Sequence, residues 1–294
     1  MSAVLAQAPA QLVVVQGDTS SALGAALAAQ LAEVPVAHVE AGLRSHDRRH
    51  PWPEEEFRIA IDRCSEVLFA PTDLSAANLR RERVKGRIHV TGNTGIDAAL
   101  SARESVHPTD GRAAEPSLLV TCHRRENWGG GIGGVAAALK RIAGEGLARI
   151  EVILHPNPAL AARVMELLGG ADRVALHPHC GHSATLARML SSSLVLSDSG
   201  GIQEEATTLG VPLLVLREKT ERPEAIACGN VELVGTEPER IVSAVRRRLN
   251  GRGAFGPSLP FGDGSASERI AEIIEEWLVF PTRRRLPHEE AWQC

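Results

Sequence analysis

The chain has 294 residues, enough for two domains of ordinary size, and its formal net charge is −4. This mildly acidic balance argues against a nucleic-acid-binding protein, which usually presents a basic face. An aromatic content of 3% also leaves few side chains for base stacking. No apolar run is long enough to cross a membrane. We therefore expect a protein with no nucleic-acid and no membrane partner.

The cysteine count and the start of the chain bear on its location. Five cysteines are present, an odd number, and none of them forms a CxxC pair. Such a set is typical of reduced thiols rather than of a disulfide framework. The first eleven residues lack the charged start and apolar core of a secretory signal. These features favour a cytoplasmic location.

Strand and helix signals alternate along the chain, which predicts an α/β fold with parallel sheets built from βα units. In the first part we expect strands at 12–15, 36–39, 67–70 and 88–91, and helices at 20–32, 54–64, 74–83 and 95–103. The stretch 105–116 is rich in Pro, Gly and Asp and predicts a linker. In the second part we expect strands at 118–121, 150–154, 173–176, 194–196, 213–216 and 231–234. Helices should follow at 133–145, 158–169, 183–191, 201–209, 223–228, 237–249 and 265–279.

Five of these strands end on polar residues that are capable of chemistry. Ligands of open parallel sheets bind outside the carboxyl ends of the strands, so we expect these residues to line one cleft. The strands lead into Asp18, Glu40, His123, His155 and the turn Asp198-Ser199-Gly200-Gly201. This mixture suits acid–base chemistry beside a bound phosphate.

The Ser199-Gly200-Gly201 turn precedes an apolar helix, and its glycines allow a ligand to approach the backbone closely. The start of a helix offers N–H groups and a partial positive charge, which suit a diphosphate. The alternative is an ordinary βα turn with Ser199 as the N-cap.

Two charged residues near this turn extend the candidate site. Arg222 follows the next strand and is able to grip a phosphate with two hydrogen bonds, unless its segment is only a solvated loop. Glu205, early in the helix that begins near Gly201, is placed to accept hydrogen bonds from a ribose diol. Its alternative role is to favour the positive end of the helix.

Asp18 and Glu40 end neighbouring strands, so their carboxylates should be close. A carboxylate that is shielded from water beside another one is suited to proton transfer near neutral pH. The structural alternatives are a helix-capping role for the Asp18 turn and an ion pair between Glu40 and Arg44. For Glu54, the first-turn position and the i,i+4 spacing to Arg58 favour a surface ion pair on the residues alone.

Histidines supply the remaining candidates. His123 stands beside two arginines that disfavour its protonation, so it is able to act as a neutral donor or acceptor. His155 lies in a His-Pro-Asn-Pro segment that is equally consistent with a turn. The cluster His177-Pro-His179-Cys180-Gly-His182 contains zinc-ligand types, but no second ligand group with partner spacing is present, so we expect no metal.

Eight ordered motifs together resemble the non-hydrolysing UDP-N-acetylglucosamine 2-epimerases, from about Leu12 to about Leu278. They are Gly17-Asp-Thr, His38-Val-Glu-Ala-Gly-Leu-Arg44, Pro53-Glu-Glu, Thr91-Gly-Asn-Thr, His123-Arg-Arg-Glu-Asn127, His155-Pro-Asn-Pro, Asp198-Ser-Gly-Gly-Ile-Gln-Glu-Glu205 and Thr220-Glu-Arg-Pro-Glu224. The resemblance implies two Rossmann-like lobes with a central cleft, as in the glycosyltransferase-B fold. It also implies no cofactor, a likeness to enzymes that interconvert UDP-N-acetylglucosamine and UDP-N-acetylmannosamine, and a homodimer.

The resemblance assigns site residues as well. Asp18, Glu40, Glu54 and His123 fall on the family's catalytic positions, which reverses the surface-pair interpretation of Glu54 and Arg58. The residues on its UDP-sugar-binding positions are Arg58, His155, Ser199, Gly200, Gly201, Glu205 and Arg222.

Two departures from the family pattern lead to further expectations. The family's opening strand and Gly-Thr-Arg-Pro-Glu loop are not found, so we expect a partial first lobe at 1–105 and a UDP-binding lobe at 106–262. Residues 263–294 should form a helix that packs back towards the first lobe, followed by a tail. We also expect low activity and marginal stability for this length. Thr185 stands near a position where the family often has an aromatic residue. The alternatives to epimerisation are a hydrolysing enzyme that releases N-acetylmannosamine and an impaired UDP-sugar-binding homologue.

Overall fold

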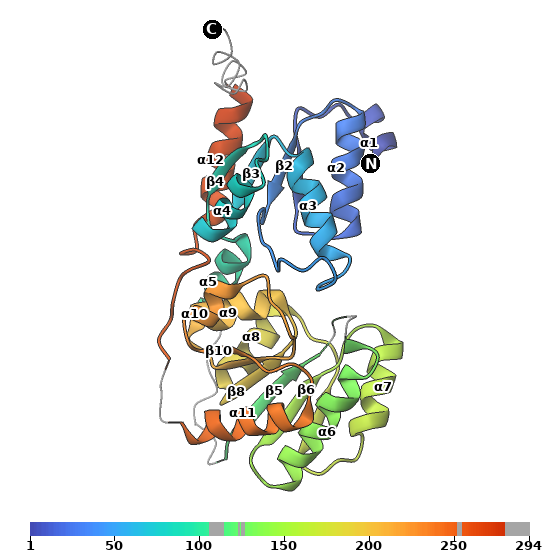
Figure 1. The fold of residues 1–294 in the computed structure, drawn as a ribbon, viewed down its shortest axis with the longest axis vertical. Coiled ribbons are helices and arrows are strands. Elements are labelled where there is room, and N and C mark those ends of the chain that lie inside the picture. The colour runs from blue at the N-terminus through green and yellow to red at the C-terminus, as the bar shows by residue number, and fades with distance from the viewer. Residues whose placement is uncertain (106–114, 123, 125–126, 252–254, 280–294) are drawn as a thin grey trace. The chain divides into compact units, whose positions relative to one another are not determined.

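The computed structural model describes residues 1–105, 115–122, 124, 127–251 and 255–279 (Figure 1). Contacts divide the chain into two compact units. The first unit comprises Met1–Gly42, Phe57–Asp97 and Gly262–Cys294, and the second comprises Leu43–Glu56 and Ala98–Phe261. The chain therefore leaves the first unit, builds most of the second, and returns to the first.

The first unit is built on a parallel sheet with the strand order β1-β2-β3-β4. The two central strands are completely buried because their Val, Leu, Phe and Ala side chains are covered on both faces, whereas β1 at the edge alternates buried and exposed residues. The strands are β1 (Val13–Gln16), β2 (Val36–Val39), β3 (Val67–Ala70) and β4 (Arg87–Val90). The helices are α1 (Ser2–Gln7), α2 (Ser20–Leu31), most of α3 (Glu54–Cys64), α4 (Asp73–Arg81), the start of α5 (Thr94–Ser105) and α12 (Ala266–Val279).

The helix α12 completes the core of the first unit. Ile270 and Trp277 are buried together with Val39 of β2 and with Val67 and Phe69 of β3. Figure 1 shows this helix in red beside the sheet of the first unit. An element from the end of the described chain thus covers the sheet that the first 90 residues build.

The second unit is built on a six-stranded parallel sheet with the order β10-β9-β8-β5-β6-β7. Numbered along the chain, this is the 3-2-1-4-5-6 order of a Rossmann fold, and the order reverses between β5 and β8. The strands are β5 (Ser117–Thr121), β6 (Arg149–Ile153), β7 (Val174–His177), β8 (Leu194–Ser197), β9 (Leu213–Val215) and β10 (Val231–Leu233). The helices are α6 (Gly131–Gly144), α7 (Pro158–Leu168), α8 (His182–Ser191), α9 (Gly200–Leu209), α10 (Pro223–Ala227) and α11 (Pro238–Asn250).

The predicted α/β class with two parallel sheets is confirmed, and each predicted strand and helix lies within about two residues of an observed one. One helix, α1, was not predicted. It has six residues, and its Leu5 packs against the core of β1, β2 and α2. A helix this short depends on packing rather than on intrinsic propensity, so the sequence alone gives little sign of it.

Candidate active site

The end of the second sheet where β5 and β8 lie side by side is the expected ligand position of a Rossmann fold. A hydrogen bond of 2.7 Å joins the hydroxyls of Thr121 and Ser197 at the ends of these strands. The segment after β5 carries residues 122–127, and the turn after β8 carries the Ser-Gly-Gly sequence. Of the first segment, His123 lies outside the described residues.

Asp198 connects these two segments. Its buried Oδ2 accepts hydrogen bonds from the Arg124 backbone N–H at 2.8 Å and from the Asn127 amide at 2.9 Å, and it lies 3.4 Å from Cys122 Sγ. The sequence analysis included Asp198 in the turn without giving it a role. A carboxylate placed directly after a fully buried strand was the available signal, because such a group needs partners.

The turn itself begins the helix α9. Ser199 occupies the N-cap position with extended backbone angles, but its side chain makes no capping hydrogen bond. A Cβ atom built on Gly201 would meet no other atom within 4 Å, so the start of the helix faces open space at this residue. A helix start with an open glycine is suited to an anionic ligand.

Arg222 lies directly against this turn. A Cβ atom built on Gly200 would be only 2.6 Å from Arg222 Nη1. The guanidinium is buried, donates from Nε to Glu204 at 2.5 Å, and donates from Nη1 to Glu221. Arg217 lies 3.0 Å from the second oxygen of Glu221. Arg222 is therefore fixed by two carboxylates, and its predicted grip on a phosphate stays a prediction.

Glu205 is the second charged residue of α9 that the sequence singled out. Burial raises the pKa of the Glu205 carboxyl, while a hydrogen bond of 3.0 Å to His182 Nε2 acts in the opposite direction. His182 is exposed and begins α8, so the two side chains lie next to each other at the surface of the second unit. The predicted contact of Glu205 with a ribose stays a prediction.

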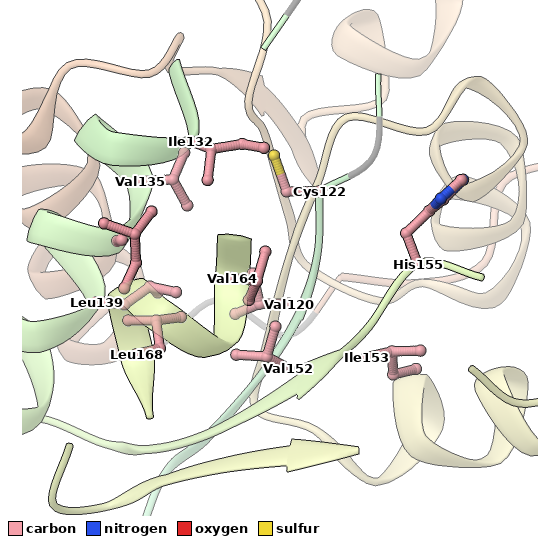
Figure 2. Close-up of a pocket in the computed structure, with 12 residues that line it drawn as sticks. Val120, Cys122, Ile132, Val135, Leu139, Val152, Ile153, His155, Val164 and Leu168 are labelled. Carbon is pink, nitrogen blue, oxygen red and sulfur yellow. The ribbon is translucent and has the colours of Figure 1, made fainter. Parts of the chain in front are cut away.

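His155 lies after β6, where the His-Pro-Asn-Pro segment forms a turn into α7. Its Nδ1 accepts a hydrogen bond of 3.0 Å from the Asn157 backbone N–H, and Asn157 caps the helix. His155 also lines a cavity of about 20 Å³ (Figure 2). Apolar side chains of α6 and α7, among them Ile132 and Leu168, form the other side of this cavity. Its size and lining identify a packing gap in the core rather than a binding pocket.

Asp18, Glu40 and Arg58 come together in the first unit. Arg58, buried on α3, donates from Nη2 to Asp18 Oδ2, and the Asp18 side chain is 28% exposed. A Cβ atom built on Gly17 would lie 3.6 Å from Glu40 Oε2, so the Glu40 carboxylate lies against the residue before Asp18. Thr19, not Asp18, caps α2, since its hydroxyl accepts the Ala22 N–H.

Glu40 also has an unusual backbone. Its φ of +71° lies in the left-handed region, which costs a residue with a side chain of order 1–3 kcal/mol and is concentrated at functional sites. The surrounding structure therefore holds the Glu40 backbone in a conformation that is unfavourable for a residue with a side chain.

Glu54 begins α3 and groups with the second unit. Its Oε1 lies 4.0 Å from Arg124 Nη1, and Arg124 Nη2 lies 3.9 Å from Glu221. The neighbouring Glu55 is buried and accepts the backbone N–H groups of Ser45 and His46. Of the three consecutive glutamates, Glu55 thus has an evident structural role, whereas the Glu54 side chain is 25% exposed and its catalytic role stays a prediction.

Within the described ranges, no three metal-ligating side chains gather closely enough to hold an ion. None of the helices described there is long and apolar enough to span a membrane.

Comparisons with known proteins agree on one family. The family model described as UDP-N-acetylglucosamine 2-epimerase matches residues 1–275. The UDP-N-acetylglucosamine 2-epimerase of Salmonella typhimurium is 39% identical over 295 residues, which cover 94% of this chain and 78% of that protein. The enzyme of Escherichia coli K12 is 40% identical over 291 residues, with coverages of 92% and 77%.

Solved structures give the same result. The UDP-GlcNAc 2-epimerase from Neisseria meningitidis, solved bound to UDP-GlcNAc, matches with a TM-score of 0.87 and 35% identity over 94% of this chain and 79% of that chain. The enzyme from Methanocaldococcus jannaschii, in complex with UDP-GlcNAc and UDP, matches with a TM-score of 0.85 and 34% identity over 94% and 78%. Since the family model and these relatives each cover most of the sequence, the chain belongs to the UDP-N-acetylglucosamine 2-epimerase family.

Proposed function

We propose that the chain interconverts UDP-N-acetylglucosamine and UDP-N-acetylmannosamine by elimination and re-addition of UDP. The carrying observation is the open Ser-Gly-Gly helix start at the β5–β8 switch point, because a relative with this fold was solved bound to UDP-GlcNAc. The substrate class is therefore a UDP-sugar with an N-acetylated carbon next to the anomeric one.

The reaction requires a bond to break at C1 and a proton to move at C2. The C1–O bond breaks and its electron pair leaves with UDP, while a carboxylate takes the proton from C2, which gives a glycal with a C1=C2 double bond. A proton then returns to C2 from the opposite face, and UDP adds back to C1. Charge develops on the diphosphate during departure, so groups that stabilise it lower the barrier.

The proposed roles follow from what each group is able to do. The helix start at Ser199–Gly201 binds the departing diphosphate through its N–H groups. Asp18, Glu40 and Glu54 are the candidates for proton transfer, together with His123. Arg58 orients the Asp18 carboxylate, because its guanidinium donates a hydrogen bond to Asp18 Oδ2.

Five further residues complete the proposed site. Arg222 stabilises the turn and the diphosphate, Glu205 binds the ribose, and His155 contributes to the UDP-sugar contacts. Gly200 and Gly201 allow the close approach of the ligand. The support for these roles is their position at or near the carboxyl ends of β6, β8 and β9.

We extend the proposal to assembly, location and lobe boundaries. The resemblance implies a homodimer, and the cysteine pattern favours the cytoplasm. Within the described residues, Cys64, Cys122, Cys180 and Cys228 form no disulfide, as a reducing compartment favours. Light scattering on the purified chain tests the dimer. The boundaries 1–105, 106–262 and 263–294 stay our proposed division, to be compared with limited proteolysis.

Three substitutions test the acid–base assignment: Asp18→Asn, Glu40→Gln and Glu54→Gln. Each should abolish epimerisation, followed by NMR of the products, while calorimetry shows UDP affinity largely unchanged, because these groups act on the sugar. Glu56→Gln is the matched control, since Glu56 lies in the same first turn of α3 and pairs with Arg48 at the surface. Near-normal turnover in all three variants contradicts the assignment. Release of free N-acetylmannosamine by the unsubstituted chain identifies a hydrolase instead.

A further inference from the structure

A histidine and an aspartate are buried together beneath the candidate acid–base residues of the first unit. His38 lies on β2 and Asp62 on α3, and both side chains are completely buried. The distance from His38 Nδ1 to Asp62 Oδ1 is 2.6 Å. Ionisable groups persist in such surroundings only when they are paired and hydrogen-bonded, so this arrangement is tightly specified.

The other ring nitrogen of His38 contacts the backbone next to Asp18. His38 Nε2 lies 2.9 Å from the carbonyl oxygen of Gly17. A carbonyl oxygen is only an acceptor, so Nε2 carries a hydrogen and donates it. The short contact with Asp62 then contains one more proton, on the ring or on the carboxyl. In either case the net charge of the two side chains is zero, which lowers the free-energy cost of burying them.

The second oxygen of Asp62 contacts the other side of the site. Asp62 Oδ2 accepts the backbone N–H of Gly42 at 3.3 Å. Gly42 stands two residues after Glu40, and its carbonyl accepts a hydrogen bond of 3.0 Å from the Asn78 side chain. The pair therefore connects the turn before Asp18 with the turn that contains Glu40.

Both turns contain left-handed backbone, which glycine adopts readily but which is unfavourable for Glu40. Gly17, Glu40 and Gly42 all have φ between +68° and +84°. A Cβ atom built on Gly42 would lie 2.3 Å from the carbonyl oxygen of Ser75, so this turn also packs tightly against α4. Hydrogen bonds from a rigid buried pair are a direct way to keep two such turns at a constant separation.

We propose that His38 and Asp62 are positioning residues, which fix the Asp18 and Glu40 turns relative to each other for proton transfer at C2 of the sugar. The inference rests on the proposed roles of Asp18 and Glu40. Neither His38 nor Asp62 is exposed, so they act through the two turns rather than on substrate.

The proposal predicts a specific loss. A catalytic group displaced by about 1 Å can cost about 100-fold in rate, so His38→Gln should lower kcat by about 10- to 100-fold. Affinity for UDP should change less than about twofold, because the Ser199–Gly201 turn belongs to the other unit. His89→Gln is the matched control, since His89 lies on β4 of the same sheet and should leave kcat unchanged.

Substitutions at Asp62 separate positioning from general loss of structure. In Asp62→Asn the amide oxygen can accept the Gly42 N–H, the amide nitrogen can donate to His38 Nδ1, and the ring keeps its hydrogen bond to Gly17. Asp62→Ala loses both contacts. We therefore expect Asp62→Asn to retain most of the kcat that Asp62→Ala loses.

Enzyme kinetics with UDP titration tests the proposal, and NMR tests it independently of activity. The proposal is overturned if His38→Gln keeps the original kcat, if UDP affinity falls in parallel with kcat, or if Asp62→Asn is as impaired as Asp62→Ala. Lack of epimerisation by the unsubstituted chain would instead reject the proposed function. In that case, proton–nitrogen NMR of His38 and amide exchange at Asp18 and Glu40 still test the pair. An unprotonated Nε2, or exchange unchanged by His38→Gln, rejects it.

Discussion

Replacing Gly200 by alanine tests how tightly Arg222 is packed against the start of α9. The new Cβ would lie 2.6 Å from Arg222 Nη1 and 2.9 Å from Cζ, closer than such atoms are found. The guanidinium has little freedom to move away, because Glu204 and Glu221 bind it on two sides and all three side chains are buried. Either these hydrogen bonds or the helix start must shift.

The size of the effect follows from this overpacking. Adding atoms to a packed core costs about 1–3 kcal/mol, which corresponds to a fall in melting temperature of about 2–12 °C for a domain of 150 to 250 residues. Gly200→Ala should also weaken UDP binding, since the helix start that faces the diphosphate is displaced. Thermal unfolding followed by circular dichroism and calorimetric titration with UDP measure the two effects.

Gly201→Ala is the matched control for the first effect. A Cβ atom there meets nothing within 4 Å, so the melting temperature should be unchanged or slightly higher. Its UDP affinity should still fall, because the added methyl group occupies the open side of the turn. Equal melting temperatures for the two variants would refute the packing argument, and unchanged UDP affinity in Gly201→Ala would refute the location of the diphosphate.

Two further predictions concern the same unit. Burial raises the pKa of the Glu205 carboxyl in the folded chain. The stability that this carboxyl contributes is therefore fully present below its pKa in the unfolded chain, and it is lost as the pH rises through its pKa in the folded chain. Compared with the original chain, Glu205→Gln should therefore have a higher free energy of unfolding at neutral and alkaline pH but not near pH 4. Urea titration at several pH values measures this difference. An increase of equal size at all pH values would contradict the prediction. Asp198→Ala should cost about 1–3 kcal/mol, because the part-buried Arg124 N–H loses its acceptor and the buried Asn127 amide keeps only the Leu216 carbonyl. Urea unfolding checks this, and a loss below 1 kcal/mol would show that the two donors find other partners.

Sequence patterns were sufficient for the sheets because buried parallel strands are continuous runs of apolar residues. Residues 67–70 and 194–196, for example, are buried throughout and lie between clear helix signals. The Ser-Gly-Gly turn was equally accessible, since glycines at a strand–helix junction have a direct backbone meaning.

Charge partners could not be predicted, because they depend on distances across the fold rather than along the chain. Arg58 stands four residues after Glu54, and local spacing favours an ion pair between them. In the structure Arg58 donates to Asp18, which is 40 residues away in the sequence. The charged segment around Arg222 has the composition of a solvated loop, yet Arg222 and Glu221 are buried with Glu204 of α9.

The His38–Asp62 pair was missed for a related reason. In the sequence His38 is one residue of a buried strand, and Asp62 is an acidic residue in the last turn of a helix. Only the packing of α3 on β2 shows that each supplies the other's partner. No pattern in the sequence thus indicates that His38 and Asp62 are in contact.

The position of α12 has a consequence for the order in which the protein folds during synthesis. Domains generally complete their folding as they leave the ribosome, beginning with the N-terminal one. Here the four strands of the first sheet are made within the first 90 residues, but Ile270 and Trp277 arrive only after the whole second unit. Until α12 is synthesised, Val39, Val67 and Phe69 lack part of the apolar surface that covers them. The first sheet therefore completes its core only after the second unit has been made. A ribosome that stalls before Ala266 leaves a nascent chain with exposed apolar surface, which is prone to aggregation.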